Sequence, residues 1–177
     1  MEFICEIQNS LTQSFCDEII ELYETETEEN KKYITTNKKC CELQLTNEKY
    51  IETLVCKLQN NLNNYLKEKN IGICFKNKLC DSTYFYINKY VKDEGYYDYH
   101  IDYQCYSNNT HRVFSFCWFL NNIDQGGEIV INEKYNIKPE TGKFLLFPSF
   151  WTHPYSENKS TDKDRYTING WIIQKGN

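Results

Sequence analysis

The sequence is poor in the residues that divide a chain into flexible parts. It has three prolines and seven glycines among 177 residues, and no stretch rich in glycine and serine. It also lacks an internal repeat and a low-complexity block. These absences exclude a disordered linker between modules, so we expect residues 1–177 to form a single domain. With 40% hydrophobic residues, a chain of this length can bury a sizeable core.

Long hydrophobic runs and targeting signals are missing as well. No segment approaches the roughly 18 apolar residues that a membrane span needs. The first six residues lack the basic segment and apolar run of a secretory signal peptide. The nine cysteines are scattered without a metal-finger spacing. We therefore expect free thiols in a reducing compartment, the cytoplasm or nucleus, and no membrane partner.

Alanine is absent, whereas asparagine, lysine, isoleucine and tyrosine are abundant. Such a bias is typical of an AT-rich genome, and a viral protein acting in a host cell is one source that we consider. The formal net charge is -5 and the pI is near 5.3. This charge disfavours a broad phosphate-binding surface, so nucleic acid is not the expected partner.

The apolar pattern changes its period along the chain. Helices are predicted at residues 12–23, with Thr12 as N-cap, and at 47–69, with a polar loop at 24–32. The predicted strands are at residues 3–7, 41–45, 83–91, 111–120, 128–132, 143–147 and 165–173. This order predicts an α+β, mainly β, domain: a double-sheet jelly roll with N-terminal helices packed on one sheet. Residues 1–80 would form a helical support region and residues 81–177 a jelly-roll catalytic core.

Two histidines and one aspartate are placed where they can share a metal ion. His100 and Asp102 are two residues apart, so in an extended strand they point to the same side and Ile101 faces away. His153 follows the apolar strand at 143–147, which would place it at the mouth of a barrel. Two imidazoles and one carboxylate form the facial triad of non-haem Fe(II) oxygenases, which leaves part of the metal open. The pattern therefore predicts a metal site of His100, Asp102 and His153.

Other interpretations of these residues remain open. A single His-x-Asp pair is more often a hydrogen-bonded surface pair than a pair of metal ligands. Zinc is the rival metal, although no zincin motif is present and an arginine that binds a carboxylate would then be unexplained. The third histidine, His111, begins a predicted strand beside Arg112, and we expect a structural role for it.

The last predicted strand carries a second polar pair. Arg165 and Thr167 share one face of this strand, and a planar guanidinium can bind a carboxylate through two hydrogen bonds. An arginine inside a barrel is rarely unpaired, so a structural ion pair with an Asp or Glu is the alternative. Lys163, which is closer to His153 in the sequence, is a competitor for the same carboxylate. We favour Arg165 because the regular strand begins there.

An ordered set of motifs resembles a known family. The chain looks like the prolyl-4-hydroxylase-like branch of the Fe(II)/2-oxoglutarate-dependent dioxygenases, most strongly from residue 90 to residue 172. The matching residues, in order, are Tyr90 with Tyr97, His100-Ile101-Asp102, Phe119-Leu120-Asn121, Gly126-Gly127-Glu128, Phe147-Pro148, His153 and Arg165-Tyr166-Thr167-Ile168-Asn169-Gly170-Trp171. None of these motifs is specific alone, but their order is.

The resemblance implies both a fold and a site. The fold is a double-stranded β-helix with supporting N-terminal helices. Fe(II) would be held by His100, Asp102 and His153, and Arg165 would bind the distal carboxylate of 2-oxoglutarate. Tyr90 matches a tyrosine whose hydroxyl helps to hold that carboxylate, and Thr167 is a weaker candidate for the same role. O2 is the second cosubstrate, and ascorbate is a candidate reductant.

Three departures from the family pattern concern the cosubstrate. Collagen-type members have lysine where this chain has Arg165, so the chain looks closer to the oxygen-sensing and ribosome-modifying branches. The segment 155–164 is longer than in many members. A second cosubstrate tyrosine of some relatives is replaced by Phe119. The resemblance therefore implies fewer hydrogen bonds to the cosubstrate than in those relatives.

The expected reaction is hydroxylation of a substrate carbon with release of succinate and CO2. By resemblance, the leading substrate is a prolyl residue in a protein or peptide. Five tyrosines near the first two ligands could hold it, or could simply fill the core: Tyr96, Tyr97, Tyr99, Tyr103 and Tyr106. The alternatives are an oxidative nucleic-acid demethylase, disfavoured by the charge and by the lack of a second arginine after Arg165, and a non-catalytic binding module on this fold. The oligomeric state is not predicted.

Overall fold

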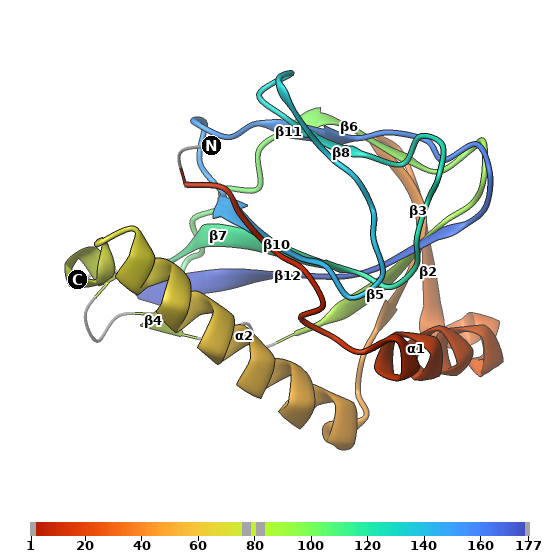
Figure 1. Cartoon of the computed structure of the whole chain (residues 1–177), viewed down its shortest axis with the longest axis horizontal. Helices are drawn as coiled ribbons and strands as arrows, with labels where there is room; N and C mark the ends of the chain where they lie inside the picture. The colour runs from red at the N-terminus through yellow and green to blue at the C-terminus, as the bar shows by residue number, and fades with distance from the viewer. Residues whose placement is uncertain (1–2, 76–78, 81–83, 176–177) are drawn as a thin grey trace.

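Two helices and one large curled sheet make up the structure. The computed structural model describes residues 3–75, 79–80 and 84–175 of the chain (Figure 1). Within these residues, no helix is long enough and apolar enough to cross a lipid bilayer. The eight cysteines whose side chains are described are all free thiols, as expected.

Both predicted helices are present, and both begin at a side-chain cap. Helix α1 (Gln13–Thr25) follows Thr12, whose hydroxyl accepts a hydrogen bond from the backbone N–H of Phe15. Helix α2 (Glu48–Glu68) follows Asn47, whose side chain accepts from the N–H of Lys49. Two short 3₁₀ helices, η1 (Glu28–Asn30) and η2 (Gly72–Phe75), complete the helical elements of the described residues.

Twelve antiparallel strands form one sheet in the described part of the chain. The strands are β1 (Cys5–Ile7), β2 (Lys31–Thr35), β3 (Lys38–Gln44), β4 (Leu79–Cys80), β5 (Tyr86–Tyr90), β6 (Tyr96–His100), β7 (Thr110–Phe119), β8 (Ile129–Ile131), β9 (Tyr135–Ile137), β10 (Phe144–Pro148), β11 (Tyr155–Glu157) and β12 (Arg165–Lys175). The neighbours run in the order β1-β10-β7-β12-β5-β3-β6-β11-β8-β9, while β2 pairs with β3 and β4 with β12.

The sheet curls so that its two halves face each other. Figure 1 shows β10, β7, β12 and β5 in a lower layer and β8, β11 and β6 in an upper layer, with β3 at the side. Helix α2 lies beneath the lower layer, and α1 lies at one end of it. The predicted fold class, a mainly β jelly roll with helices on one sheet, is confirmed.

Strand β7 shows how the core is divided. Its alternate residues Phe114, Phe116 and Trp118 are buried in the cluster that the helices cover, whereas Cys117 and Phe119 are buried in a second cluster inside the roll. A strand that is buried on both faces needs apolar side chains at nearly every position. Each large apolar side chain that is fully buried stabilises the fold by about 1.5–3 kcal/mol.

Five strands were not predicted, because each is either polar or short, as β4 is at two residues. Strand β2, partly inside the predicted loop at 24–32, is polar and pairs only with β3, so it has no buried face to mark it. Strands β9 and β11 are three residues long, and β6 is interrupted by polar residues. Four strands of the sheet, β1 to β4, lie within residues 1–80, the region expected to be helical support. The start of the predicted strand at Thr83 lies outside the described residues.

Candidate functional site

The first two predicted ligands meet at the end of β6. His100 is the last residue of this strand, and Asp102 lies two residues further along. The Nε2 atom of His100 is 3.5 Å from Oδ1 of Asp102. Ile101 faces away and is 44% exposed, as the extended alternation predicts.

The hydrogen bonds of His100 leave one ring nitrogen ready to bind a metal. Nδ1 lies 2.6 Å from the carbonyl oxygen of Asp98. A carbonyl oxygen can only accept, so Nδ1 carries the proton and Nε2 of the neutral ring keeps its lone pair. Nε2 is buried and has no hydrogen-bond partner among the described residues. The ring itself is held by Tyr97, which stacks on it at a centroid distance of 3.6 Å.

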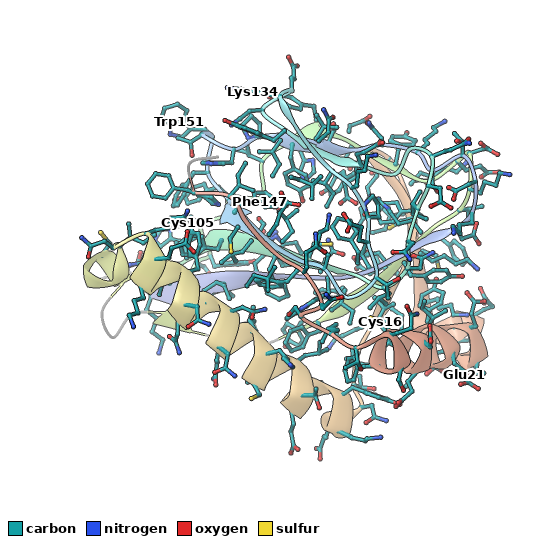
Figure 2. All side chains as sticks on the ribbon, viewed as in Figure 1. Cys16, Glu21, Cys105, Lys134, Phe147 and Trp151 are labelled. Carbon is teal, nitrogen blue, oxygen red and sulfur yellow. The ribbon has the colours of Figure 1, made fainter. Side chains whose placement is uncertain are left out.

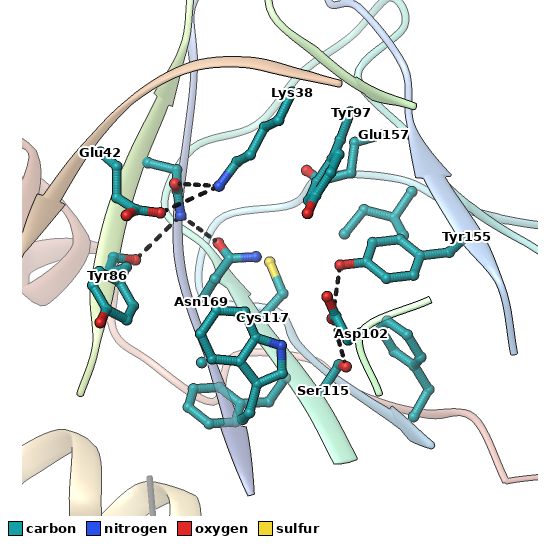
Figure 3. A pocket seen from close by; sticks show the side chains of 16 residues that line it. Lys38, Glu42, Tyr86, Tyr97, Asp102, Ser115, Cys117, Tyr155, Glu157 and Asn169 are labelled. Carbon is teal, nitrogen blue, oxygen red and sulfur yellow. Dashed lines mark hydrogen bonds and ion pairs between the residues drawn. The ribbon is translucent and has the colours of Figure 1, made fainter. Parts of the chain in front are cut away.

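Asp102 is buried with one oxygen engaged and the other facing His100. Its Oδ2 accepts hydrogen bonds from Ser115 Oγ at 2.7 Å and from Tyr155 OH at 2.9 Å (Figure 3). Both contacts are made by hydroxyl donors, so they favour the charged carboxylate over the protonated acid. Asp102 is therefore a carboxylate with Oδ1 directed to the free Nε2.

The third predicted ligand, His153, comes from another part of the sheet. His153 lies in the turn after β10, where its ring Nδ1 is 2.9 Å from Thr152 Oγ1. It is buried and lines a separate hollow with Asn132, Tyr135 and Pro148. Among the described residues, no three His, Cys, Asp or Glu side chains are grouped closely enough to hold one metal ion. The role of His153 as third ligand stays a prediction.

The predicted cosubstrate residues Arg165 and Tyr90 do lie together. Strand pairing sets them opposite each other, and the guanidinium carbon is 4.1 Å from the centre of the Tyr90 ring. Both surround the carboxylate of Glu157 on β11: Arg165 Nη2 donates to Oε2 at 2.6 Å, and Tyr90 OH donates to Oε1 at 3.1 Å. Arg165 Nη1 also donates to the carbonyl oxygen of Gly127 at 2.7 Å. The buried arginine therefore has a carboxylate partner within the chain.

Thr167 and Lys163 have other surroundings. Thr167 is buried beside Arg165 on β12, and its hydroxyl donates to Oδ1 of Asn169. Lys163 is about half exposed and lies 3.6 Å from Asp124 and 3.8 Å from Asp162. Of the two basic residues considered for the carboxylate, Arg165 is the one inside the roll.

A narrow cavity connects the Asp102 end to the Glu157 end. Its volume is about 20 Å³, which is room for little more than one water molecule. Lys38 from β3 enters it, with Nζ 2.8 Å from Asn88 Oδ1 and 3.4 Å from Glu42 Oε2 (Figure 3). Since Asp102 and Glu157 both line this space, it is where the two predicted halves of the site meet.

The cavity residues that were not identified from the sequence include Lys38, Ser115, Tyr155 and Glu157. Ser115 carried a usable signal, because a serine between Phe114 and Phe116 in a strand buried on both faces must point to a polar partner. Glu157 carried none, since the segment 155–164 reads as a polar loop and its pairing with Arg165 depends on the curl of the sheet.

A family model settles the class of protein. The model described as the 2OG-Fe(II) oxygenase superfamily matches residues 85–173, which include β5 to most of β12. The chain belongs to this superfamily. No curated protein matches the chain in sequence.

Solved structures of similar fold include three prolyl hydroxylases. A viral collagen prolyl hydroxylase from Paramecium bursaria Chlorella virus-1, in complex with 2OG, has a TM-score of 0.75 at 16% identity and covers 97% of this chain and 96% of its own. A Pseudomonas putida prolyl-4-hydroxylase has a TM-score of 0.78 at 14% identity, over 99% and 95%. A Trichoplax adhaerens prolyl hydroxylase, in complex with a hypoxia inducible factor peptide fragment, has a TM-score of 0.73 at 20% identity, over 98% and 84%. At these identities the likeness shows the fold.

The superfamily implies an iron ion and 2-oxoglutarate, and the described residues fit the iron better than they fit the 2-oxoglutarate. An Fe(II) ion suits Nε2 of His100, which has no hydrogen-bond partner among the described residues, and the nearby Oδ1 of Asp102, since neutral imidazole and carboxylate are its preferred ligands. The donors of Arg165 and Tyr90 suit a carboxylate, but Glu157 already fills them. At the end of the cavity formed by His100 and Asp102, the metal end, a ring nitrogen therefore has no partner among the described residues. At the end formed by Arg165 and Tyr90, the carboxylate end, the donors hold the carboxylate of Glu157.

Proposed function

We propose that the protein is a dioxygenase that uses Fe(II), 2-oxoglutarate and O2 to hydroxylate a prolyl residue in a protein or peptide, with release of succinate and CO2. The membership of the superfamily supports the use of 2-oxoglutarate and iron. The similar folds of three prolyl hydroxylases support the substrate class. The observation that carries the proposal is the buried Nε2 of His100, which has a lone pair, no described hydrogen-bond partner and a carboxylate oxygen 3.5 Å away.

In this proposal His100, Asp102 and His153 hold the metal. When bound, Fe(II) together with 2-oxoglutarate supplies the activated oxygen that hydroxylation of a carbon requires. The carbonyl oxygen of Asp98 fixes the proton of His100 on Nδ1, and Ser115 and Tyr155 fix the Asp102 carboxylate. These contacts orient both ligands before the metal arrives. Arg165 and Tyr90 are the proposed anchor of the distal carboxylate.

Exposed apolar side chains near the metal end suit a proline-containing segment. Tyr99 and Tyr103, which flank the two ligands in sequence, are 51% and 40% exposed. Tyr103 stacks on Phe150 at 5.0 Å, next to Trp151, which is 78% exposed and stands out from the surface in Figure 2. Aromatic faces bind proline rings well because they bury them at little cost in side-chain entropy. These residues are our candidates for substrate contact.

Succinate release tests the proposal. The protein would be incubated under air with Fe(II), ascorbate and 2-oxoglutarate, and proline-rich peptides would be added in turn, beside matched peptides with alanine at each proline. We expect turnover that requires iron, rises with a proline-containing peptide and is lost in His153→Ala. No turnover, together with no binding of 2-oxoglutarate to the metal-loaded protein, would contradict the enzyme and leave a binding module on this fold.

A further inference from the structure

The carboxylate of Glu157 occupies a place that the site offers to a ligand. Its two oxygens accept hydrogen bonds from Arg165 at 2.6 Å and from Tyr90 at 3.1 Å. These two donors are the ones proposed above for the distal carboxylate of 2-oxoglutarate. One carboxylate cannot be held there while the other remains.

The burial of this pair makes the contact strong. The side chain of Arg165 is 0% exposed and that of Glu157 is 1% exposed. A guanidinium in such surroundings needs a carboxylate, and a charge-assisted hydrogen bond is stronger there than at a surface. Arg165 Nε has no hydrogen-bond partner among the described atoms, so one donor remains unused even with Glu157 in place.

The size of the cavity points the same way. At about 20 Å³ it cannot take a 2-oxo acid of ten non-hydrogen atoms. Glu157 is the lining residue whose movement would both enlarge the cavity and release Arg165. It ends β11, and the pairing of β11 with β6 shifts register between Tyr155 and Glu157. A strand end beside an irregular register can release a side chain without breaking a regular ladder.

We infer that Glu157 sets the selectivity of this oxygenase among 2-oxo acids by competing for the anchor formed by Arg165 and Tyr90. This inference rests on the proposed function. A 2-oxo acid with a distal carboxylate must displace Glu157 to reach Arg165, so it gains little over a 2-oxo acid that lacks one. Glu157 therefore weakens the preference for 2-oxoglutarate that Arg165 would otherwise give.

A metal-free experiment tests the anchor itself. Glu157→Ala would leave Arg165 and Tyr90 without their carboxylate, and propionate would be added with propionamide as the neutral control. We expect propionate to raise the Tm of Glu157→Ala by several degrees and to leave the wild type and Glu42→Ala unchanged. Glu42 is a matched control because it lines the same cavity and contacts Lys38 rather than Arg165. Equal effects of propionate and propionamide on Glu157→Ala would overturn the inference.

A binding experiment tests selectivity. The Mn(II)-loaded protein would be titrated with 2-oxoglutarate and with 2-oxopentanoate, which has the same chain length but no distal carboxylate. We expect the wild type and Glu42→Gln to prefer 2-oxoglutarate by less than about 3-fold, and Glu157→Gln by at least about 10-fold, a difference that Arg165→Met removes. Glu157→Gln keeps the shape of the side chain, so it remains informative if Glu157→Ala does not fold.

Two results would overturn this inference and leave the proposed function intact. One is a wild type that already discriminates as strongly as Glu157→Gln. The other is a preference in Glu157→Gln that Lys38→Met removes and Arg165→Met does not, because the distal carboxylate would then be bound by Lys38. Binding of neither acid to any metal-loaded variant would contradict the proposed function and the inference together.

Discussion

The two ends of the cavity differ in whether their polar groups already have partners. At one end, His100 Nε2 and Asp102 Oδ1 face each other at 3.5 Å, and the described residues offer Nε2 no hydrogen bond. At the other end, Arg165 and Tyr90 both donate to Glu157, and Nε of Arg165 is the donor of this pair without a partner among the described residues. Buried polar groups without partners are costly, so their presence indicates a ligand, whereas a satisfied pair indicates a structural role or a competitor.

The largest expected effect is the loss of the metal end. His100→Ala or Asp102→Ala should lower succinate release on the order of 1000-fold, because each variant removes one of the three proposed ligands and the Fe(II) ion then contributes several kcal/mol less. His111→Ala is the control for metal affinity, since His111 lies in β7 and its ring contacts Tyr103 rather than Asp102. Metal affinity measured by calorimetry should fall in parallel. Metal affinity of His100→Ala at the level of His111→Ala would contradict the assignment.

The next effect is on the stability of the protein, through the ion pair at the carboxylate end. Arg165→Met should lower the free energy of unfolding by about 3–5 kcal/mol, because it leaves the buried Glu157 carboxylate without its cation. The double variant Arg165→Met with Glu157→Leu should recover most of this loss, since no buried charge remains. Urea unfolding of the metal-free proteins measures both. A double variant as unstable as the sum of the single variants would show that the two side chains do not act as a pair.

A smaller effect is expected from the contacts that hold Asp102. Ser115→Ala removes one of the two donors to Oδ2 and should weaken metal binding about 10- to 100-fold. Ser14→Ala, on the exposed surface of α1, is the control and should bind metal like the wild type. An unchanged affinity of Ser115→Ala would mean that Tyr155 alone orients the carboxylate.

The smallest effect lies far from both ends. Thr12→Ala removes the hydroxyl that caps α1 and should cost about 1 kcal/mol of stability, while Thr12→Ser should cost less. Neither variant should change metal affinity or the preference among 2-oxo acids. A changed affinity in Thr12→Ala would show that the helical side of the sheet is coupled to the cavity.

The features of the fold and the site that could be predicted from the sequence are those that depend on the pattern of neighbouring residues. The cap Thr12, the two helices and the alternation of β12, with Arg165 inward, follow from neighbouring residues. The expected proximity of His100 and Asp102 follows from the geometry of an extended chain. These features need no knowledge of distant partners.

What it did not predict depends on contacts between distant segments. The buried Asn61 of α2 was missed because its hydrogen-bond partner, Ser10, is 51 residues away in the sequence. Ser10 in turn accepts from Trp118, which is 108 residues away from it. The pairing of Glu157 with Arg165 and Tyr90 requires β11 and β5 to face each other across the roll. An acidic residue in a short polar segment gives no sign of such a partner.

The most direct test is an anaerobic titration of the Fe(II)-loaded protein with 2-oxoglutarate, followed by visible absorption, on the wild type and Glu157→Gln. If His100 and Asp102 bind the metal, an absorption band should appear in both proteins when 2-oxoglutarate is added. If Glu157 competes for Arg165 and Tyr90, the band should appear in Glu157→Gln at a 2-oxoglutarate concentration at least about 10-fold lower than in the wild type. Absence of the band in both proteins would contradict the metal end, and equal concentrations would contradict the competition by Glu157.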